Sequence, residues 1–460
     1  MSRYLALDLG TTTIKAALFG DDGRMLALER AETTLITGSD GMVECDPRFW
    51  FELPCSLIRR ITDRFGADDI TALAVSSQGL SILPVDEDFM PLRQGISWLD
   101  TRADAECREI FALCPDISER TGKPYNPQYT LPKLIWLKKY ELALFERAHM
   151  FLMPLDYLCA RLTGAAVTDH SMAGGSMLYE PEKCAFSTDL AERFGIPIEK
   201  LPKIEACGYS IGRLTEEGAA LTGLSVDTTV ALGGQDQKIA ALGAGLDNRA
   251  PTLSLGTSCA IEFVGSVKGF PRFIHTDGKT PLSEGCINTA CGAIKWLSSI
   301  IGLDYDTIDA MAEAADSGNL IFRPHLAGVG TPYGQTVKPA AFENLTLDTD
   351  RGQLCRALLE GIACEIRRNI EAAVADGCVI EGLRAFGGGC RSGILCRIIA
   401  DITQLPLTVL PITEMALFGA ASAASLADRG CPLPIADSEI KQYQPSDAAK
   451  NNLIYQRYID

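Results

Sequence analysis

Short apolar runs separated by turn-forming residues mark the beginning of the chain. The runs are residues 4–7, 14–19 and 25–28, and the segments between them contain Gly10-Thr11-Thr12-Thr13 and Asp22-Gly23. Asp-Gly is a strong signal for a two-residue hairpin turn, and a glycine beside hydroxyl residues is typical of a tight turn. The pattern predicts a meander of three strands whose first turn is rich in Gly and Thr.

A longer segment with helical periodicity follows. Asp46-Pro47 has the form of a helix start, a capping residue before a proline at the first helical position, and the helix could extend to about residue 65. Residues 70–75 indicate a buried strand that ends in Ser76-Ser77-Gln78-Gly79, and residues 83–92 indicate a hairpin. Helical and loop patterns dominate from about 102 to 225.

A second strand–turn–strand pattern begins at residue 252 and repeats the first. Leu255-Gly256-Thr257-Ser258 corresponds to Leu9-Gly10-Thr11-Thr12, and each motif places Gly-Thr and a further hydroxyl between two apolar runs. Such self-similarity is the sequence sign of duplicated units. It predicts two related domains that face one cleft, with a boundary near residues 245–251.

The last third of the chain alternates helical and strand patterns. Residues 383–386 indicate a strand that leads into Gly387-Gly388-Gly389, and helices are expected at about 392–403 and 414–429, with a strand at 407–410 between them. The apolar positions before this strand recur every four residues and predict one face of a long helix; they are Leu354, Leu358, Ile362, Ile366 and Ile370. The whole pattern predicts the α/β class.

Composition narrows the classes of function. The 460 residues include 42 Lys and Arg against 59 Asp and Glu, a net charge of −17, whereas nucleic-acid binding needs a basic surface. No apolar run approaches the roughly 18 residues of a membrane span. The 16 cysteines contain no C-x-x-C pair and no signal peptide is visible, so reduced thiols and a cytoplasmic location are expected, without nucleic-acid or membrane partners.

Two Gly-Thr turns are candidates for binding phosphate. Successive backbone N–H groups of a tight turn form an anion-binding concavity, the threonine hydroxyls add donors, and Lys15 adds positive charge. Asp8, just before the first turn, is a candidate for holding Mg²⁺ through water, because Mg²⁺ uses few carboxylates. The alternative for both turns is a plain β-turn with threonines as strand formers.

Two further glycine-containing segments follow predicted strands. Gly387-Gly388-Gly389 precedes a helix, where a flat ligand could lie against the backbone and phosphate could meet the helix N-terminus; the alternative is a tight connection. Asp236, in Gly233-Gly234-Gln235-Asp236-Gln237, stands where a general base would sit. Its alternative is an exposed helix cap.

Trp98-Leu99-Asp100-Thr101-Arg102 is a candidate wall of a sugar site. The ring offers an apolar face, and the charged groups can bind hydroxyls. The alternative is a helix start in which Asp100 is the cap and Arg102 lies on the surface. The four histidines form no recognisable catalytic motif.

Together these motifs resemble the FGGY family of carbohydrate kinases, within the actin-like ATPase superfamily and closest to its xylulokinase-like branch. Nine short motifs occur in the family's order, nearly from end to end. They are Asp8-Leu9-Gly10-Thr11-Thr12; Ser77-Gln78; Trp98-Leu99-Asp100-Thr101-Arg102; Thr130-Leu131-Pro132-Lys133-Leu134-Ile135-Trp136-Leu137; Gly234-Gln235-Asp236-Gln237; Leu255-Gly256-Thr257-Ser258; Leu359-Glu360-Gly361-Ile362-Ala363; Gly387-Gly388-Gly389-Cys390-Arg391-Ser392; and Ala416-Leu417-Phe418-Gly419-Ala420-Ala421.

The resemblance implies two ribonuclease-H-like domains around a central cleft: an N-terminal domain, 1–247, on the sugar side, and a C-terminal domain, 248–460, on the nucleotide side. It implies that ATP and Mg²⁺ serve to phosphorylate a hydroxyl of a sugar, ketose or polyol. Asp236 would be the general base and Asp8 the metal-associated carboxylate. The implied nucleotide residues are Gly10, Thr11, Thr12, Thr13, Lys15, Gly256, Thr257, Gly292, Gly388, Gly389 and Ser392. The implied substrate residues are Gln78, Gly79, Trp98, Asp100, Gln128, Asp236 and Gln237.

The chain departs from the family pattern at two places. Gly79 and Leu80 stand where members of known specificity often carry larger polar residues, Arg-Glu in glycerol kinases and Met-His in xylulokinases. This difference argues against glycerol as the substrate and also against true xylulokinase activity. Cys291 stands where a glycine is expected, with Gly292 next to it, so a nucleotide contact shifts by one residue.

One alternative function shares the phosphate turns. An actin-like ATPase that couples hydrolysis to a change of shape would need them too, but it would not need Asp236 or the Trp98 segment. The family resemblance also implies a homodimer, while the substrate stays open among ketopentoses, polyols and aldonates.

Overall fold

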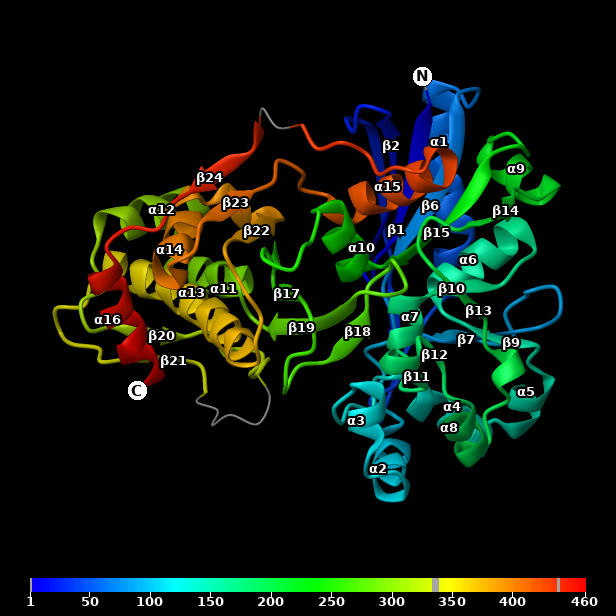
Figure 1. Ribbon diagram of the computed structural model, residues 1–460, viewed down its shortest axis with the longest axis horizontal. Helices are drawn as coiled ribbons and strands as arrows, with labels where there is room; N and C mark the ends of the chain where they lie inside the picture. The colour runs from blue at the N-terminus through cyan, green and yellow to red at the C-terminus, as the bar shows by residue number, and fades with distance from the viewer. Residues whose placement is uncertain (1, 333–338, 437–438) are drawn as a thin grey trace. The chain divides into compact units, whose positions relative to one another are not determined.

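The computed structural model describes residues 2–332, 339–436 and 439–460. The chain forms two compact units (Figure 1). Unit 1 consists of Met1–Gly243, Arg272–Pro281 and Ala416–Ile435, and unit 2 of Ala244–Pro271, Leu282–Met415 and Ala436–Asp460. The expected functional division at 247/248 stays a prediction.

Unit 1 is built on a six-stranded mixed sheet. Its order is β14-β15-β6-β1-β2-β3. β15, β6 and β1 are parallel to one another, whereas β14 pairs antiparallel with β15 and the β1–β2–β3 meander is antiparallel. The strands are β1 (Arg3–Leu9), β2 (Thr13–Gly20), β3 (Met25–Glu32), β6 (Ile70–Ser77), β14 (Ser210–Arg213) and β15 (Thr229–Gln235). The expected meander is therefore confirmed.

Unit 2 repeats this arrangement. Six of its strands follow the order β24-β23-β22-β16-β17-β19, with β23, β22 and β16 parallel and both flanks antiparallel. The strands are β16 (Thr252–Leu255), β17 (Cys259–Val264), β19 (Pro281–Ile287), β22 (Leu383–Phe386), β23 (Leu407–Val409) and β24 (Lys441–Tyr443). Read from β14 in unit 1 and from β24 in unit 2, the six strands correspond one to one, as the repeated Gly-Thr pattern predicts.

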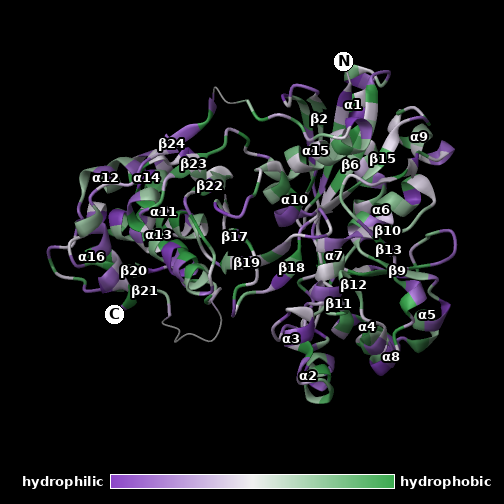
Figure 2. Cartoon of the chain, in the orientation of Figure 1, coloured by the Kyte–Doolittle hydropathy of each residue, from purple (hydrophilic) through white to green (hydrophobic). Residues whose placement is uncertain are grey.

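Helices pack on both sheets, and their buried side chains form the hydrophobic cores together with those of the strands. In unit 1, α15 packs on the meander, where Phe418 meets Phe19 with ring centroids 6.0 Å apart and Asp428 accepts a 2.8 Å hydrogen bond from Tyr4. In unit 2, the predicted face of the long helix is buried at Leu358, Ile362, Ile366 and Ile370. Figure 2 shows hydrophobic colours along the strands and hydrophilic stretches on outer helices such as α9.

The helices of the two units have these bounds. In unit 1 they are α1 (Glu52–Phe65), α2 (Asp104–Leu113), α3 (Ile117–Thr121), α4 (Thr130–Tyr140), α5 (Leu142–Arg147), α6 (Pro154–Thr163), α7 (His170–Gly174), α8 (Thr188–Phe194), α9 (Glu216–Thr222), α10 (Asp236–Gly243) and α15 (Met415–Arg429). All of α15 except its first residue, Met415, belongs to unit 1. Unit 1 also has 3-10 turns at Pro47–Trp50, Pro181–Lys183 and Ile198–Lys200. In unit 2 they are α11 (Cys291–Ile301), α12 (Tyr305–Ala314), α13 (Arg351–Ala375), α14 (Gly393–Thr403) and α16 (Ala448–Ile459), with a 3-10 turn at Gly388–Arg391.

Smaller strands fill the connections. They are β4 (Leu35–Thr37), β5 (Val43–Cys45), β7 (Leu83–Val85), β8 (Gly95–Ile96), β9 (Met150–Leu152), β10 (Val167–Asp169), β11 (Tyr179–Glu180), β12 (Ala185–Phe186), β13 (Lys203–Glu205), β18 (Arg272–Ile274), β20 (Ile321–Arg323) and β21 (Ala341–Glu343).

Two predicted elements differ from the structure. The helix expected from residue 46 begins as a 3-10 turn capped by Asp46, and α1 starts only at Glu52. The hairpin expected at 83–92 has one regular strand, β7, whose partner is β9; residue 91 contributes only an isolated bridge to Val85. Pro91 lacks the N–H that a regular second strand would need.

All 16 cysteines lie in the described residues and all are free. This agrees with the expected reduced thiols. Within the part of the chain that the structure describes, no helix combines the length and apolar character needed to cross a membrane.

Candidate functional site

Three neighbouring parallel strands of unit 1 end at the same edge of the sheet. Asp8 on β1 pairs in register with Ser76 on β6, and Ser76 pairs with Gly234 on β15. In parallel sheets, ligands bind at the carboxyl ends of the strands. The segments that leave these ends carry the first Gly-Thr turn, Gln78 and Asp236, so the fold gathers these predicted residues at one edge.

Asp8 lies half-buried at this edge. Its Oδ1 accepts a 2.9 Å hydrogen bond from the Ser76 hydroxyl. Lys15 is its direct partner on β2, so the two side chains share a face of the sheet. The carboxylate and the neighbouring threonine hydroxyls are oxygen donors of the kind Mg²⁺ takes. The described residues contain no group of three or more His, Cys, Asp or Glu side chains suited to a metal ion, and Mg²⁺ commonly binds one or two carboxylates together with substrate phosphates.

The first Gly-Thr turn needs its glycine. A Cβ at Gly10 would lie 2.7 Å from the Thr13 carbonyl oxygen. Thr12 is exposed, and Thr11 and Thr13 are half-buried. The turn is therefore partly exposed to solvent, as an anion-binding turn requires.

The Thr11 hydroxyl joins this turn to two predicted sugar residues. It accepts a 2.8 Å hydrogen bond from Trp98 Nε1 and donates a 2.9 Å hydrogen bond to Gln78 Oε1. Thr11 therefore orients the Trp98 ring and the Gln78 amide. Residue spacing alone does not reveal this link, because the three residues come from three separate segments.

Asp236 stands at the start of α10, directly after β15. Close packing before it depends on glycine, since a Cβ at Gly233 would lie 1.8 Å from the Val75 carbonyl oxygen. The Gln237 N–H donates to Asp236 Oδ1 at 2.7 Å, and the Gln235 side-chain amide donates to the same oxygen. The carboxylate thus lies at the first residue of its helix and at the carboxyl edge of the strand, and its role as a base stays a prediction.

A buried pair behind Asp236 was not found from the sequence. The Ser171 hydroxyl donates to Asp169 Oδ2 at 2.6 Å and accepts a 2.9 Å hydrogen bond from the Gln235 N–H. Asp169 is fully buried and also caps α7. Burial raises the pKa of Asp169 to about 6, although the hydrogen bonds from Ser171 and Met172 oppose the shift.

The Trp98 segment is held by a charged network. Asp100 is 1% exposed and accepts hydrogen bonds from the Val43 N–H at 2.8 Å and from Arg102 Nε at 2.9 Å. Arg102 also pairs with buried Glu44 at 2.8 Å. The alternative that placed Arg102 on the surface is wrong, because both of its carboxylate partners are buried and hold it in place.

Of the remaining predicted sugar residues, Gly79 and Gln128 lie in loops and Gln237 lies in the first turn of α10. A Cβ at Gly79 would come within 3.3 Å of Gln235 Cγ, so Gly79 allows that side chain to approach. Gln128 and Gln237 are half-buried. The Gln128 side chain accepts a 3.3 Å hydrogen bond from the Asn126 amide.

Gly256 and Thr257 of unit 2 pack against the first turn of α11, which contains Gly292. The Gly292 N–H donates to the Thr257 carbonyl at 2.9 Å, and the Cys291 N–H donates to the Gly256 carbonyl at 3.1 Å. A Cβ at Gly292 would lie 2.9 Å from that Thr257 oxygen. Gly292 therefore lets α11 lie against the second Gly-Thr turn, with Cys291 preceding it.

The triple-glycine segment lies against Leu255, the last residue of β16, just before the second Gly-Thr turn. Gly387 has a φ of 100°, and a Cβ there would lie 2.8 Å from the Leu255 carbonyl oxygen. A Cβ at Gly389 would lie 2.5 Å from Cys291 Sγ, whereas one at exposed Gly388 would meet nothing within 4 Å. The segment therefore contains one open backbone position between two tightly packed ones.

Ser392 serves as the N-cap of α14. Its hydroxyl accepts a 3.1 Å hydrogen bond from the Leu395 N–H and donates a 2.9 Å hydrogen bond to Asp309. The helix N-terminus that follows the glycines is thus fixed by a side-chain cap.

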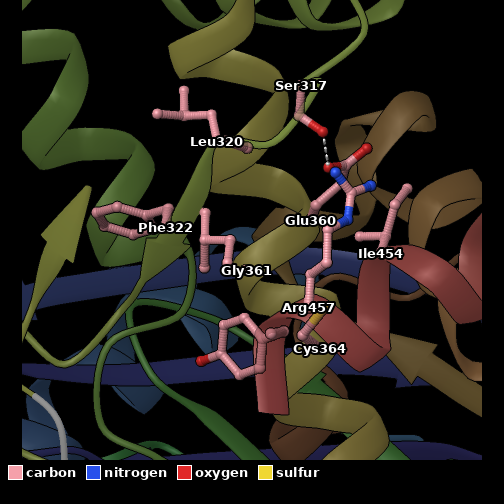
Figure 3. A pocket seen from close by; sticks show the side chains of 11 residues that line it. Ser317, Leu320, Phe322, Glu360, Gly361, Cys364, Ile454 and Arg457 are labelled. Atoms are coloured by element: carbon pink, nitrogen blue, oxygen red, sulfur yellow. Dashed lines mark hydrogen bonds between the residues drawn. The ribbon is translucent and has the colours of Figure 1, made fainter. Parts of the chain in front are cut away.

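A small cavity in unit 2 is unrelated to these loops. It lies between α13, α16 and the 317–322 segment and has a volume of about 10 Å³ (Figure 3). The Ser317 hydroxyl donates to Glu360 on its wall at 2.6 Å. This volume suits about one water molecule, so the cavity is too small for a sugar or a nucleotide.

Known proteins match nearly the whole chain. Residues 3–243 match the N-terminal domain of the FGGY family of carbohydrate kinases, and residues 252–427 match its C-terminal domain. A xylulose kinase from Staphylococcus xylosus is 25% identical over 442 residues, 93% of this chain and 92% of that protein. A glycerol kinase from Gloeobacter violaceus is 30% identical over 443 residues, 92% of this chain and 87% of that protein.

A solved structure extends the match to the fold. A "xyloylose kinase" from Brucella ovis superposes with a TM-score of 0.89 at 29% identity and covers 99% of this chain and 98% of its own. The sequence and the fold therefore both match carbohydrate kinases. The chain belongs to the FGGY family of carbohydrate kinases and, as in that family, uses ATP to phosphorylate a carbohydrate.

Proposed function

We propose that the protein transfers the γ-phosphoryl group of ATP to a hydroxyl of a small sugar, ketose or polyol, with Asp236 as general base. The observation that carries the proposal is the position of Asp236 at the carboxyl edge of β15, beside the strand ends that bear Asp8 and Gln78. Ligands of parallel sheets bind at this edge. A carboxylate there can accept the proton of a substrate hydroxyl as its oxygen attacks phosphorus.

The acceptor side is proposed to lie in unit 1. An aromatic ring would come from Trp98, and a backbone position without a side chain from Gly79. Side-chain amides would come from Gln78, Gln128 and Gln237. Asp100 contributes by holding Arg102 and the Val43 backbone, since these groups already occupy both of its oxygens. Gly79 and Leu80 offer no side-chain hydrogen bonds, so the acceptor's hydroxyls are recognised mainly by the amides and the carboxylate.

The donor side is proposed to involve both Gly-Thr turns. Gly10, Thr12, Thr13 and Lys15 would contact phosphate from unit 1, and Thr11 would use its backbone N–H because its hydroxyl already accepts and donates within the protein. In unit 2, Gly256, Thr257 and Gly292 would contact the outer phosphates, and Gly388, Gly389 and Ser392 would flank the adenosine. Asp8 would hold Mg²⁺, which neutralises charge on the phosphates when it is bound.

Positioning of the reacting groups dominates catalysis of phosphoryl transfer. The Thr11 hydroxyl fixes the Trp98 ring and the Gln78 amide relative to the phosphate turn. The Gln235 amide and the Gln237 N–H fix one oxygen of Asp236. A cytoplasmic location and a homodimer stay predictions.

The test is Asp236→Asn, which keeps the size of the side chain and removes the base. We expect sugar phosphorylation to fall by about 10²- to 10⁴-fold, the usual contribution of general base catalysis, while the dissociation constant for ATP stays within about twofold. Asp227→Asn is the matched control, because Asp227 is an exposed partner of Arg213 on the surface. Near-normal turnover of Asp236→Asn would reject Asp236 as the base.

A further inference from the structure

Lys133 on α4 is a buried lysine that the proposed chemistry does not use. It is 1% exposed. Its Nζ donates to the Leu80 carbonyl at 3.0 Å and to the Gln128 carbonyl at 2.7 Å. Lysine is almost never fully buried without a partner, because leaving water is costly for an ammonium group. Here both acceptors are backbone groups of the two loops proposed to face the sugar.

The first of these loops has an unusual backbone. Leu80 has a φ of 66°, in the left-handed region that branched or bulky residues rarely adopt. Its side chain is fixed as well, since a Cβ at Gly175 would lie 2.4 Å from Leu80 Cδ2. Such a conformation is strained and persists only where its surroundings hold it. The Lys133 hydrogen bond holds the carbonyl of this residue, two positions after Gln78.

The second loop is fixed at Gln128, which is itself a proposed sugar-binding residue. The Gln128 N–H donates to the Asn126 side chain at 3.0 Å, which turns the Gln128 carbonyl toward Lys133. One amino group thus joins Gln128 to Leu80, 48 positions away in the sequence. Their separation is set by Lys133 rather than by either loop alone.

The neutral form of Lys133 has as many N–H donors as it has carbonyl acceptors in the structure. Burial lowers its pKa to about 7, and nearby Arg102 adds to this effect while Asp100 opposes it. A neutral amine has two N–H donors, and the structure provides two carbonyls. Above neutral pH the side chain is mainly neutral and can therefore satisfy both loops without carrying a buried charge.

We propose that Lys133 is a positioning residue that fixes the 78–80 loop and Gln128 relative to each other and thereby sets the affinity for the sugar. The inference rests on the proposed function, because it assumes that these loops face the acceptor. Lys133 itself touches neither sugar nor nucleotide. It acts through the Leu80 and Gln128 carbonyls, and so through the backbone of the two loops that carry the Gln78 and Gln128 side chains.

The chain provides a matched control on the same helix. Lys138 on α4 also donates to two backbone carbonyls at the C-terminal end of α8, those of Phe194 at 3.3 Å and Gly195 at 3.0 Å. This helix end contains no proposed site residue. Lys138→Met therefore removes the same kind of anchor from the same helix without touching the sugar loops.

The experiment compares Lys133→Met, Lys133→Gln and Lys138→Met with the wild type. The steady-state KM is measured for the acceptor that the wild type uses best among D-xylulose, D-ribulose, D-gluconate and glycerol, and the KM for ATP is measured at saturating acceptor. We expect Lys133→Met to raise the acceptor KM by about tenfold or more, with the ATP KM and the acceptor-independent ATP hydrolysis within about twofold. Lys133→Gln, which keeps a neutral NH₂ group, should give an intermediate KM, and Lys138→Met should match the wild type.

Each other outcome is decisive. Equal effects on both KM values, or the same acceptor KM in Lys133→Met as in Lys138→Met, would overturn the positioning role and leave the proposed function intact. If both Lys133 variants fail to fold while Lys138→Met folds, Lys133 serves stability alone and the inference is wrong. A wild type that phosphorylates none of the four acceptors would overturn the proposed function and this inference with it.

Discussion

At the scale of single residues, the orientation of Asp236 depends on groups that lie behind it. The Gln235 amide donates to its Oδ1, and the Gln235 backbone is in turn anchored by the Ser171 hydroxyl. Ser171 also donates to buried Asp169. Hydrogen bonds to the backbone and to the side chain of Gln235 therefore connect a fully buried carboxyl, through this residue, to the proposed base.

Ser171→Ala tests this connection. The substitution leaves the Gln235 N–H without its acceptor and removes a donor from Asp169, so we expect a loss of about 1–3 kcal/mol in stability at pH 8 and a fall in kcat of about tenfold. The measurements are the thermal midpoint and the steady-state rate. Ser56→Ala is the control, because the Ser56 hydroxyl donates to a helix carbonyl on the exposed side of α1.

The pH dependence of this variant has a definite sign. The folded-state pKa of Asp169, about 6, lies above its ordinary value of 3.8, so the folded protein binds the proton more tightly and its stability falls as pH rises from about 4 to 6. Without the Ser171 donor the pKa rises further, and the fall extends to higher pH. The difference in thermal midpoint from the wild type should be larger at pH 8 than at pH 5; a difference independent of pH would contradict the role given to Asp169.

At the scale of elements, the glycines divide into those that the fold needs and one that it leaves open. A Cβ at Gly233, Gly292 or Gly389 would lie within 3 Å of another atom, whereas a Cβ at Gly388 would meet nothing within 4 Å. Packing therefore explains the first three without reference to a ligand. Gly388 is the position in the triple-glycine segment where a ligand can come closest to the backbone.

Gly388→Ala separates binding from folding. We expect the thermal midpoint to stay close to the wild type, since the added methyl group meets no protein atom, while the KM for ATP rises by about tenfold, equivalent to about 1.4 kcal/mol. Gly212→Ala on β14 is the control, because its Cβ would make only an ordinary contact at 3.8 Å. An unchanged ATP KM in Gly388→Ala would show that the adenosine does not lie against this turn.

Local patterns predicted most elements because each depends on neighbouring residues. The Gly-Thr meander, the strand before Asp236 and the buried face of α13 all follow from periodicity and turn residues. The hairpin at 83–92 was mispredicted because its partner, β9, lies more than fifty residues away. The charged network around Asp100 was missed for the same reason, since Glu44 comes from β5.

At the scale of the whole molecule, the duplicated Gly-Thr pattern corresponds to two sheets of matching strand order. Sequence alone located the repeat but not the full membership of each unit. The segments Arg272–Pro281 and Ala416–Ile435 complete unit 1 although they follow much of unit 2 in the chain. Tertiary pairs such as Phe19 with Phe418 bring them back, and no local pattern records such pairs.

The acidic charge of the molecule is compatible with an anionic cosubstrate. The net charge is −17, yet the proposed phosphate contacts are backbone N–H groups, hydroxyls and Lys15 at turns, which act locally. A metal held by Asp8 would add positive charge there. A basic surface is therefore not required for ATP to bind.

The most direct test of the account is ADP formation by the wild-type protein with Mg²⁺ and ATP, measured with and without each of D-xylulose, D-ribulose, D-gluconate and glycerol. The account predicts strong stimulation by at least one of these acceptors, with one phosphorylated acceptor formed for each ADP. ATP hydrolysis that none of them stimulates, together with assembly into filaments or stimulation by peptides, would contradict it and would favour an ATPase that couples hydrolysis to a change of shape.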